Sequence, residues 1–108
     1  MISRIVSCTV KPERINEFRN ALKTEVLPNI TREPGFVDLV ESFDTTTGDF
    51  VCTTLWNTRQ DVENYDKGLF QELAQRLIPM VNGQPDIKTL TVENSTVHDI
   101  SSGRSAAA

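Results

Sequence analysis

Apolar residues recur along the chain with two different periods, and segments of the two kinds alternate. The first segment, Ile2 to Val10, is rich in β-branched residues and predicts a strand. From Pro12 onward the apolar residues recur every three or four positions, which predicts an amphipathic helix. We expect Pro28 to kink or end this helix near Leu27, because proline has no amide hydrogen. The residues that define the apolar stripe are Ile15, Phe18, Leu22, Val26 and Ile30.

A hairpin is predicted in the middle of the chain. "REPG" (Arg32 to Gly35) interrupts the helical pattern, and Phe36 to Phe43 follows as a second strand. Asp44 to Asp49 is rich in turn-forming residues, and Phe50 to Trp56 has the composition of a third strand. Two strands joined by so short a glycine-containing segment predict an antiparallel hairpin.

After the hairpin the chain returns to the helical period and then to a strand. Thr58 is placed to cap a second helix, with Asp61 three residues further on. Gly68 is expected to divide this helix into two pieces, and "NGQP" (Asn82 to Pro85) is expected to end it. Asp86 to Glu93 predicts a fourth strand. The apolar stripe of the second helix consists of Val62, Leu69, Leu73, Leu77 and Met80.

The element order is β-α-β-β-α-β, which predicts an α+β, ferredoxin-like fold with a four-stranded antiparallel sheet and both helices on one face. A chain of 108 residues is typical of one domain. We assign residues 1–95 to that domain. Residues 96–108, which end in "SSGRSAAA", are expected to form a flexible tail.

The predicted strands are apolar on both faces. In the third strand Phe50, Cys52, Thr54 and Trp56 point one way, and the residues between them point the other way. In the second strand, Phe36 and Val40 are predicted on one face, and Val37, Leu39 and Phe43 on the other. In the first strand, Val6, Cys8 and Val10 are predicted on one face, and Ile5 on the other.

Two helices can cover only one of these faces, so the second face needs another cover. A bare apolar sheet would aggregate, and a second copy of the same sheet is the simplest partner. We therefore predict a homodimer in which two sheets face each other. The alternative is a wet second face formed by threonine and serine side chains.

The composition excludes several classes of partner and site. The net charge is -4, the pI is about 4.9 and there is no run of Lys or Arg, so nucleic acid is not an expected partner. No apolar run is long enough for a signal peptide or a membrane span, which predicts a cytoplasmic protein. Cys8 and Cys52 are expected to be buried thiols, the alternative being a disulfide or a reactive thiol. His98 is the only histidine, too few for a zinc site, so no metal is expected.

The candidate chemistry depends on a pocket, because the sequence has no GxSxG, Walker or GxGxxG motif. We expect this pocket between the helices and the sheet. On a helical wheel Tyr65 and Arg76 lie at one edge of the apolar stripe, and Trp56 ends the third strand. The alternatives are structural: Arg76 forms an exposed pair with Glu72, and Trp56 is a large core residue. Tyr65 would then pack its ring and leave its hydroxyl in water. Asn57 is expected to serve local backbone hydrogen bonds.

Three stretches give the chain a resemblance to the antibiotic biosynthesis monooxygenase domain family. They are "VKPERINEF", "EPGF" and "TLWNTRQDVENY". Together with the element order, the resemblance covers residues 2 to 93. It implies a dimeric α+β barrel. Some members of this family oxidise polycyclic phenols to quinones with dioxygen and without metal or flavin, which implies a reaction with no cofactor.

The resemblance also implies site residues. In the cofactor-free oxygenases the site uses a Trp at the strand end and an Arg on the second helix, positions that Trp56 and Arg76 match. The same pattern has an Asn four residues before the Trp and a Tyr six residues after it, where this chain has Cys52 and Val62. Tyr65 lies near the second of these positions without being equivalent to it. The haem-degrading branch uses a His on the second helix, and "LFQELAQRL" has none, so haem degradation is not expected.

The sequence therefore predicts a cofactor-independent monooxygenase that acts on a small or polycyclic aromatic molecule. In this interpretation Arg76 stabilises a phenolate, Trp56 stacks on the ring and Tyr65 donates a hydrogen bond inside a dry pocket. Two alternatives stay open: a non-catalytic ligand-binding or scaffold protein of the same fold, and a small-metabolite isomerase or lyase. An Arg76 that points into a cavity with Trp56 favours an enzyme, and one that pairs with Glu72 in solvent favours a scaffold.

Overall fold

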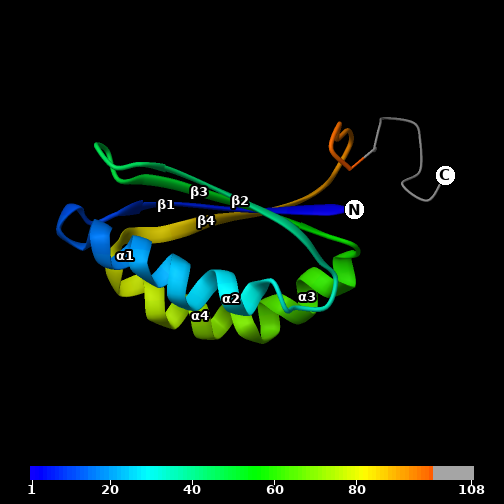
Figure 1. Cartoon of the computed structure of the whole chain (residues 1–108), viewed down its shortest axis with the longest axis horizontal. Helices are drawn as coiled ribbons and strands as arrows, with labels where there is room; N and C mark the ends of the chain where they lie inside the picture. Colours follow the sequence, from blue (N-terminus) through cyan, green and yellow to red (C-terminus); the bar gives the residue numbers. More distant parts are fainter. Residues whose placement is uncertain (99–108) are drawn as a thin grey trace.

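The sheet has four antiparallel strands in the order β2-β3-β1-β4. The structure is a computed structural model and describes residues 1–98. Its strands are β1 (Ile2–Val10), β2 (Phe36–Asp44), β3 (Asp49–Trp56) and β4 (Val81–Thr91). The labelled helices all lie on one side of this sheet (Figure 1). The predicted ferredoxin-like α+β fold is thus confirmed.

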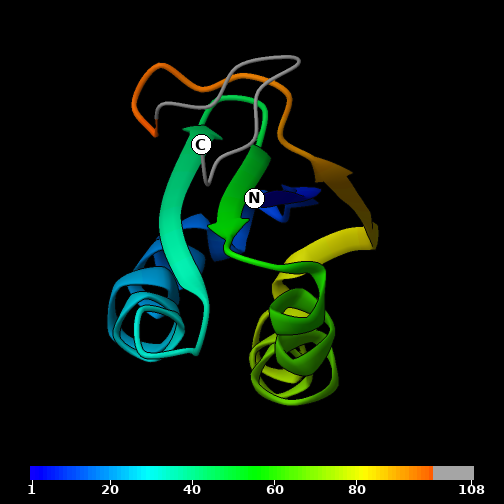
Figure 2. The ribbon, with the colours of Figure 1, turned by 90° about the vertical axis from the view of Figure 1, so that its right-hand side faces the viewer.

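Two helical arms cover this face of the sheet. The first helical arm consists of η1 (Pro12–Arg14), α1 (Ile15–Ala21), η2 (Leu22–Val26) and α2 (Leu27–Ile30). The second helical arm consists of α3 (Arg59–Lys67), α4 (Leu69–Leu77) and η3 (Ile78–Met80). Figure 2 looks along the arms and shows them side by side beneath the sheet.

The second helical arm begins and divides as the sequence predicts. Thr58 caps α3, because its hydroxyl oxygen accepts a hydrogen bond from the Asp61 amide at 3.1 Å. Gly68 separates α3 from α4 with backbone angles outside the helical region (φ -109°, ψ -102°). The predicted division of this helix at Gly68 is therefore confirmed.

Of the two effects predicted for Pro28, a kink or an end near Leu27, the end does not occur, and the helix is irregular just before Leu27 instead. Leu22–Val26 form a π-helical turn, and the helix then continues through Pro28 to Ile30. In a π turn the hydrogen bonds join residues five apart, so the turn is wider than in an α-helix. The widened turn accommodates the proline ring, which would clash with the preceding turn of a regular helix.

The second helical arm ends at Met80, just before the predicted breaker, but Asn82 to Pro85 lie within β4, which begins at Val81 and not at the predicted Asp86. The register of β1 against β4 shifts between the pairs Ser7–Asp86 and Thr9–Asn82, so β4 contains extra residues at this point. Gly83 has a φ of 69°, a backbone conformation that glycine adopts readily and that often occurs in β-bulges. Turn-forming residues therefore serve here as a bulge inside a strand.

A second bulge corrects the predicted faces of β2. Phe36 lies opposite Trp56 and Asp38 lies opposite Leu55, so β2 has one extra residue between the two pairs. Phe36 consequently packs against the core, and its ring meets the Trp56 ring edge-on at 5.7 Å. The prediction that Phe36 shares a face with Val40 is wrong, since Val40 is 58% exposed.

The core lies between the sheet and the helical arms. Phe18 of α1 meets the rings of Phe43 and Phe50 edge-on, with centroids 5.8 Å and 5.0 Å away. The alternation predicted for β3 is confirmed, since Phe50 is buried and the following Val51 is exposed. The sheet face away from the helices carries three exposed apolar side chains, Val40, Val51 and Leu90.

Gly35, the glycine of "EPGF", lies close to Asp61 at the start of the second helical arm. Gly35 has a φ of 83°, and a Cβ there would lie 2.6 Å from the Asp61 Cβ. Gly83 also has a positive φ, but a Cβ there would meet nothing within 4 Å. We expect Gly83→Ala to cost about 1 kcal/mol through backbone strain alone. Gly35→Ala adds a clash and is expected to cost about 3 kcal/mol.

The free energy of unfolding, measured by urea titration of both variants and the parent chain, checks this expectation. Gly83→Ala is the matched control for positive φ without crowding. Equal losses of stability in the two variants would contradict the close packing of Gly35 on Asp61.

Candidate functional site

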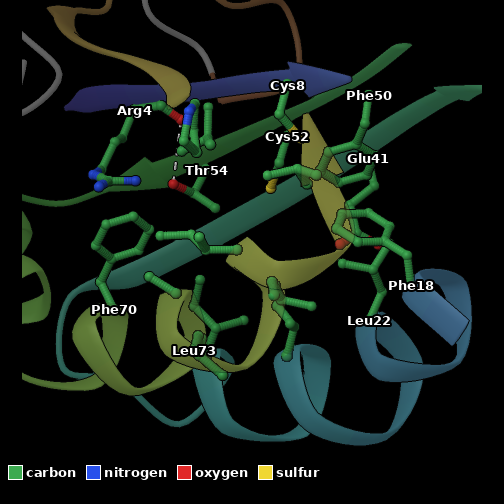
Figure 3. A pocket seen from close by; sticks show the side chains of 18 of the residues that line it. Arg4, Cys8, Phe18, Leu22, Glu41, Phe50, Cys52, Thr54, Phe70 and Leu73 are labelled. Atoms are coloured by element: carbon green, nitrogen blue, oxygen red, sulfur yellow. Dashed lines mark hydrogen bonds between the residues drawn. The ribbon is translucent and has the colours of Figure 1, made fainter. Parts of the chain in front are cut away.

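A cavity lies between the sheet and the helical arms, as the sequence predicts (Figure 3). Its volume is about 90 Å³, smaller than the roughly 150 Å³ of a protein cavity that holds benzene. A ligand larger than one ring therefore needs some side chains to move. Ile78 lines the cavity and is 42% exposed, so the cavity reaches the surface near the end of the second helical arm. The helical arms contribute apolar walls, among them Phe18, Leu22, Leu73 and Leu77.

Arg4 brings a buried charge to this apolar space. Its position follows from strand alternation, because Ile2, Arg4 and Val6 point to the same face of β1. Only 2% of Arg4 is exposed. Its Nη2 lies 2.8 Å from the Asp66 carboxylate, while its Nε has no hydrogen-bond partner among the described residues. A guanidinium is stable at such a depth only when it is paired with an opposite charge. Asp66, near the end of α3, supplies that charge.

Two aromatic rings flank the Arg4 guanidinium. Its central carbon lies 4.1 Å from the ring centroid of Phe70 and 5.5 Å from that of Tyr65. The cation is attracted to the negative faces of both rings. The cavity thus has one end with a fixed positive charge and aromatic walls.

Tyr65 lies where the sequence predicts, at the cavity wall. It is 5% exposed and lines the cavity from α3. Burial raises the pKa of its hydroxyl well above the ordinary value, and the neighbouring Arg4 charge only partly offsets this effect. Tyr65 is therefore a neutral hydrogen-bond donor at physiological pH.

Trp56 packs against the Tyr65 ring and does not itself line the cavity. It is fully buried, and its ring lies 4.8 Å from the Tyr65 ring. Its indole N–H donates a hydrogen bond to the Thr54 hydroxyl at 2.8 Å, and that hydroxyl donates to the Arg4 carbonyl at 3.4 Å. The indole donor is therefore already satisfied within the core.

Arg76 lies on the solvent side of α4 and is not part of the cavity wall. Its side chain is 45% exposed, and its Nε lies 3.0 Å from a Glu25 carboxylate oxygen on the first helical arm. A second carboxylate, that of Glu17, lies 4.0 Å from its Nη1. Arg76 thus bridges the two arms instead of pairing with Glu72. Asn57 is exposed, and its backbone N–H donates a hydrogen bond to the Gly35 carbonyl at 2.9 Å.

Two charged residues that line the cavity and could take part in a reaction were not predicted from the sequence. They are Arg4 and Glu41. Glu41 points from β2 to the face shared by Leu39 and Phe43, and it lines the cavity. Burial raises the pKa of its carboxyl, and its Oε2 has no hydrogen-bond partner among the described residues. In each case a charged residue stands at an inward position of an alternating strand. Extending the apolar alternation through every position of β1 and β2 would have identified both residues.

The two cysteines are free thiols, which excludes a disulfide between them. Cys52 lies opposite Glu41 on β2 and Val6 on β1, and both thiols line the cavity. Burial raises the pKa of Cys52 to about 12 and also raises that of Cys8. Both thiols are partly buried, where full burial was predicted, and both are neutral near pH 7.

For metals and membranes, the structure gives information within residues 1–98, the part of the chain that it describes. In this range no three His, Cys, Asp or Glu side chains gather into a group that would hold a metal ion. Over the same residues no helix has the length and apolar character needed to cross a membrane.

Comparison with known proteins adds a family match. A family model described as "Antibiotic biosynthesis monooxygenase" matches residues 1–78. A search of curated proteins finds no match.

Several solved structures share the fold. A monooxygenase from the gene ActVA-Orf6 of Streptomyces coelicolor, in complex with the ligand nanaomycin D, is 19% identical with a TM-score of 0.73, over 87% of this chain and 88% of that one. SnoaB, a cofactor-independent oxygenase from Streptomyces nogalater, is 16% identical with a TM-score of 0.73, over 88% and 95%. A conserved protein from Methanosarcina mazei is 19% identical with a TM-score of 0.71, over 82% and 88%. At these identities the likeness shows the fold.

Proposed function

Because this chain belongs to the antibiotic biosynthesis monooxygenase family, we propose that it is a cofactor-independent monooxygenase acting on a small or polycyclic aromatic substrate. Two proteins of the same fold are described as a monooxygenase with bound nanaomycin D and as a cofactor-independent oxygenase. The observation that carries the proposal is the apolar cavity with a buried guanidinium between two aromatic rings.

A reaction of dioxygen with an aromatic substrate requires that the substrate itself supply the electrons. Loss of a proton converts a phenol or a related carbon acid into an electron-rich anion, which is the form that reduces oxygen. A dry cavity with a fixed cation stabilises that anion more than water does, because the protein dipoles and charges are already oriented. Arg4 is the cation that faces the cavity, and Tyr65 adds a neutral hydroxyl donor beside it.

The roles of the three residues suggested by the sequence are part of the proposal. Tyr65 donates to the substrate oxygen, and Trp56 fixes the Tyr65 ring by packing on it. The resemblance gives anion stabilisation to Arg76, whereas the cavity geometry favours Arg4 for this role. The two arginines therefore need to be compared directly.

Oxygen uptake with a panel of hydroquinones and anthrones tests the function. We expect uptake by the wild-type protein and a loss of about 10²-fold in Arg4→Met, because one preorganised charge is removed. Arg19→Met, which changes an exposed arginine of α1, is the matched control and retains the wild-type rate. A complete lack of uptake across the panel would refute the oxygenase proposal.

Two further variants locate the site. Trp56→Phe is expected to slow uptake by loosening Tyr65, with a smaller loss than Arg4→Met. If Arg76→Ala lost more activity than Arg4→Met, anion stabilisation would belong to Arg76, and the cavity would not be the reaction site.

A non-catalytic ligand-binding protein is the second candidate. It is favoured by two observations: the Trp56 indole donor is satisfied in the core, and Arg76 lies outside the cavity. Binding of an aromatic ligand without oxygen uptake would support this candidate over the enzyme.

We also propose that the protein is a homodimer joined through the sheet faces that the helices leave uncovered. Val40 and Leu90 on that face are 58% and 50% exposed, an apolar surface that a second sheet would bury. Such an interface has two-fold symmetry, since the same face is used by both copies.

Sedimentation equilibrium at micromolar concentration tests this assembly. The expected mass is twice the 12.1 kDa of the chain. Val51→Lys places a charge on the face and is expected to give monomers, whereas Thr46→Lys in the exposed β2–β3 turn retains the dimer. A wild-type protein that sediments only as a monomer would contradict the proposal.

A further inference from the structure

Two side chains that line the apolar cavity each carry a buried polar atom with no hydrogen-bond partner among the described residues. One is a donor, the Arg4 Nε–H, and the other is an acceptor, the Glu41 Oε2. Buried polar groups are nearly always hydrogen-bonded, and each exception calls for a physical explanation. A cavity ligand that carries one acceptor and one donor would satisfy both atoms.

The two atoms belong to opposite ends of the cavity. Arg4 lies opposite Thr54, and Glu41 lies opposite Cys52, so the two charged residues are two strands apart and two positions apart along the sheet. Strand spacing and rise place their Cα atoms about 12 Å from each other. Figure 3 shows Arg4 and Glu41 on the two sides of the view, with Thr54 and Cys52 between them.

Among residues 1–98, no cation pairs with the Glu41 carboxylate. The Arg4 charge is shared with Asp66 at 2.8 Å, and burial is the only cause that raises the pKa of Glu41. The other titratable side chains that face the cavity are Cys8 and Cys52 from the sheet and Tyr65 from α3, all neutral near pH 7. A half-buried carboxylate in such surroundings is a stronger base than a solvated one.

We propose that Glu41 is the general base of this cavity and that Arg4 holds the anion which proton removal creates. This inference rests on the proposed function, since it assigns the proton-transfer step of the same site. The matching substrate is a flat conjugated molecule with an acidic C–H or O–H at the Glu41 end. Its carbonyl oxygen lies at the Arg4 end.

The proton transfer balances without any further reagent. The C–H or O–H bond of the substrate breaks, and a new O–H bond forms on the Glu41 carboxylate. The electron pair stays on the substrate and spreads through the conjugated system to the distant oxygen. That oxygen, now an enolate or phenolate, accepts the hydrogen bond from Arg4 Nε.

Hydrogen–deuterium exchange separates this step from the reaction with oxygen. The probe is anthrone, whose acidic CH₂ and carbonyl stand at opposite positions of the central ring. In D₂O without oxygen, NMR follows the loss of the CH₂ signal. We expect wild-type protein to catalyse exchange, with a rate that rises with pH as Glu41 loses its proton, above the ordinary glutamate range. Glu41→Gln is expected to slow the exchange about 10²-fold.

Glu72→Gln is the matched control, since it changes an exposed glutamate of α4 and retains the wild-type exchange rate. Wild-type exchange rates in Glu41→Gln would overturn the assignment of the base, even if oxygen uptake is normal. Absence of exchange in the wild-type protein would overturn it as well. Exchange that depends on Glu41 without oxygen uptake would support the base and refute the monooxygenase, leaving an isomerase or lyase.

A stability measurement shows that Glu41→Gln is folded and tests the buried carboxylate independently. The pKa of Glu41 is higher in the folded than in the unfolded state, so folding favours the protonated carboxyl. Its contribution to the free energy of unfolding is complete below the unfolded-state pKa and is lost as pH rises through the folded-state pKa. The variant lacks this loss. Its thermal midpoint is therefore expected to exceed that of the wild type at pH 8 and to approach it at pH 4. A lower midpoint than the wild type at pH 8 would contradict a strained carboxylate in the cavity.

Discussion

The burial of the Arg4 guanidinium is the constraint on which the rest of the site depends. A charge in the middle of an apolar strand face is stable only when an opposite charge and polarisable surfaces enclose it. Asp66 at the end of α3 supplies the opposite charge, and Phe70 and Tyr65 supply the rings. The junction of α3 and α4 is thereby fixed over β1. The same junction forms one end of the cavity, so the fold and the site share this cation.

A second constraint comes from the irregular positions of the sheet. The extra residue in β2 turns Phe36 towards Trp56, and Trp56 in turn packs on Tyr65. An aromatic layer thus connects the hairpin to the second helical arm and stands behind the cavity wall. On the other side of the cavity, the bulge in β4 brings Pro85 into the lining. Regular strands and helices form the frame, and the bulges shape the space inside it.

The sequence predicted the elements well because each has a clear hydrophobic period, and it predicted Thr58 and Gly68 because capping and breaking are local effects. It failed where strand pairing outweighs local preference, as at Asn82 to Pro85, which form part of β4. For the site, the sequence identified Tyr65 from its place on the helix. It did not identify Arg4 or Glu41, since a charged residue in a strand is ordinarily assigned to the wet face.

In the proposed site, aromatic ligands enter the cavity and present an oxygen to Arg4. A crystal structure with anthraquinone, which has no acidic hydrogen and so stays unreacted, tests this directly. We predict the ring between the sheet and α4, with one carbonyl oxygen about 2.7–3.2 Å from Arg4 Nε and the opposite edge towards Glu41. A ring bound at the outer surface beside Arg76, or on the uncovered face of the sheet, would contradict the account.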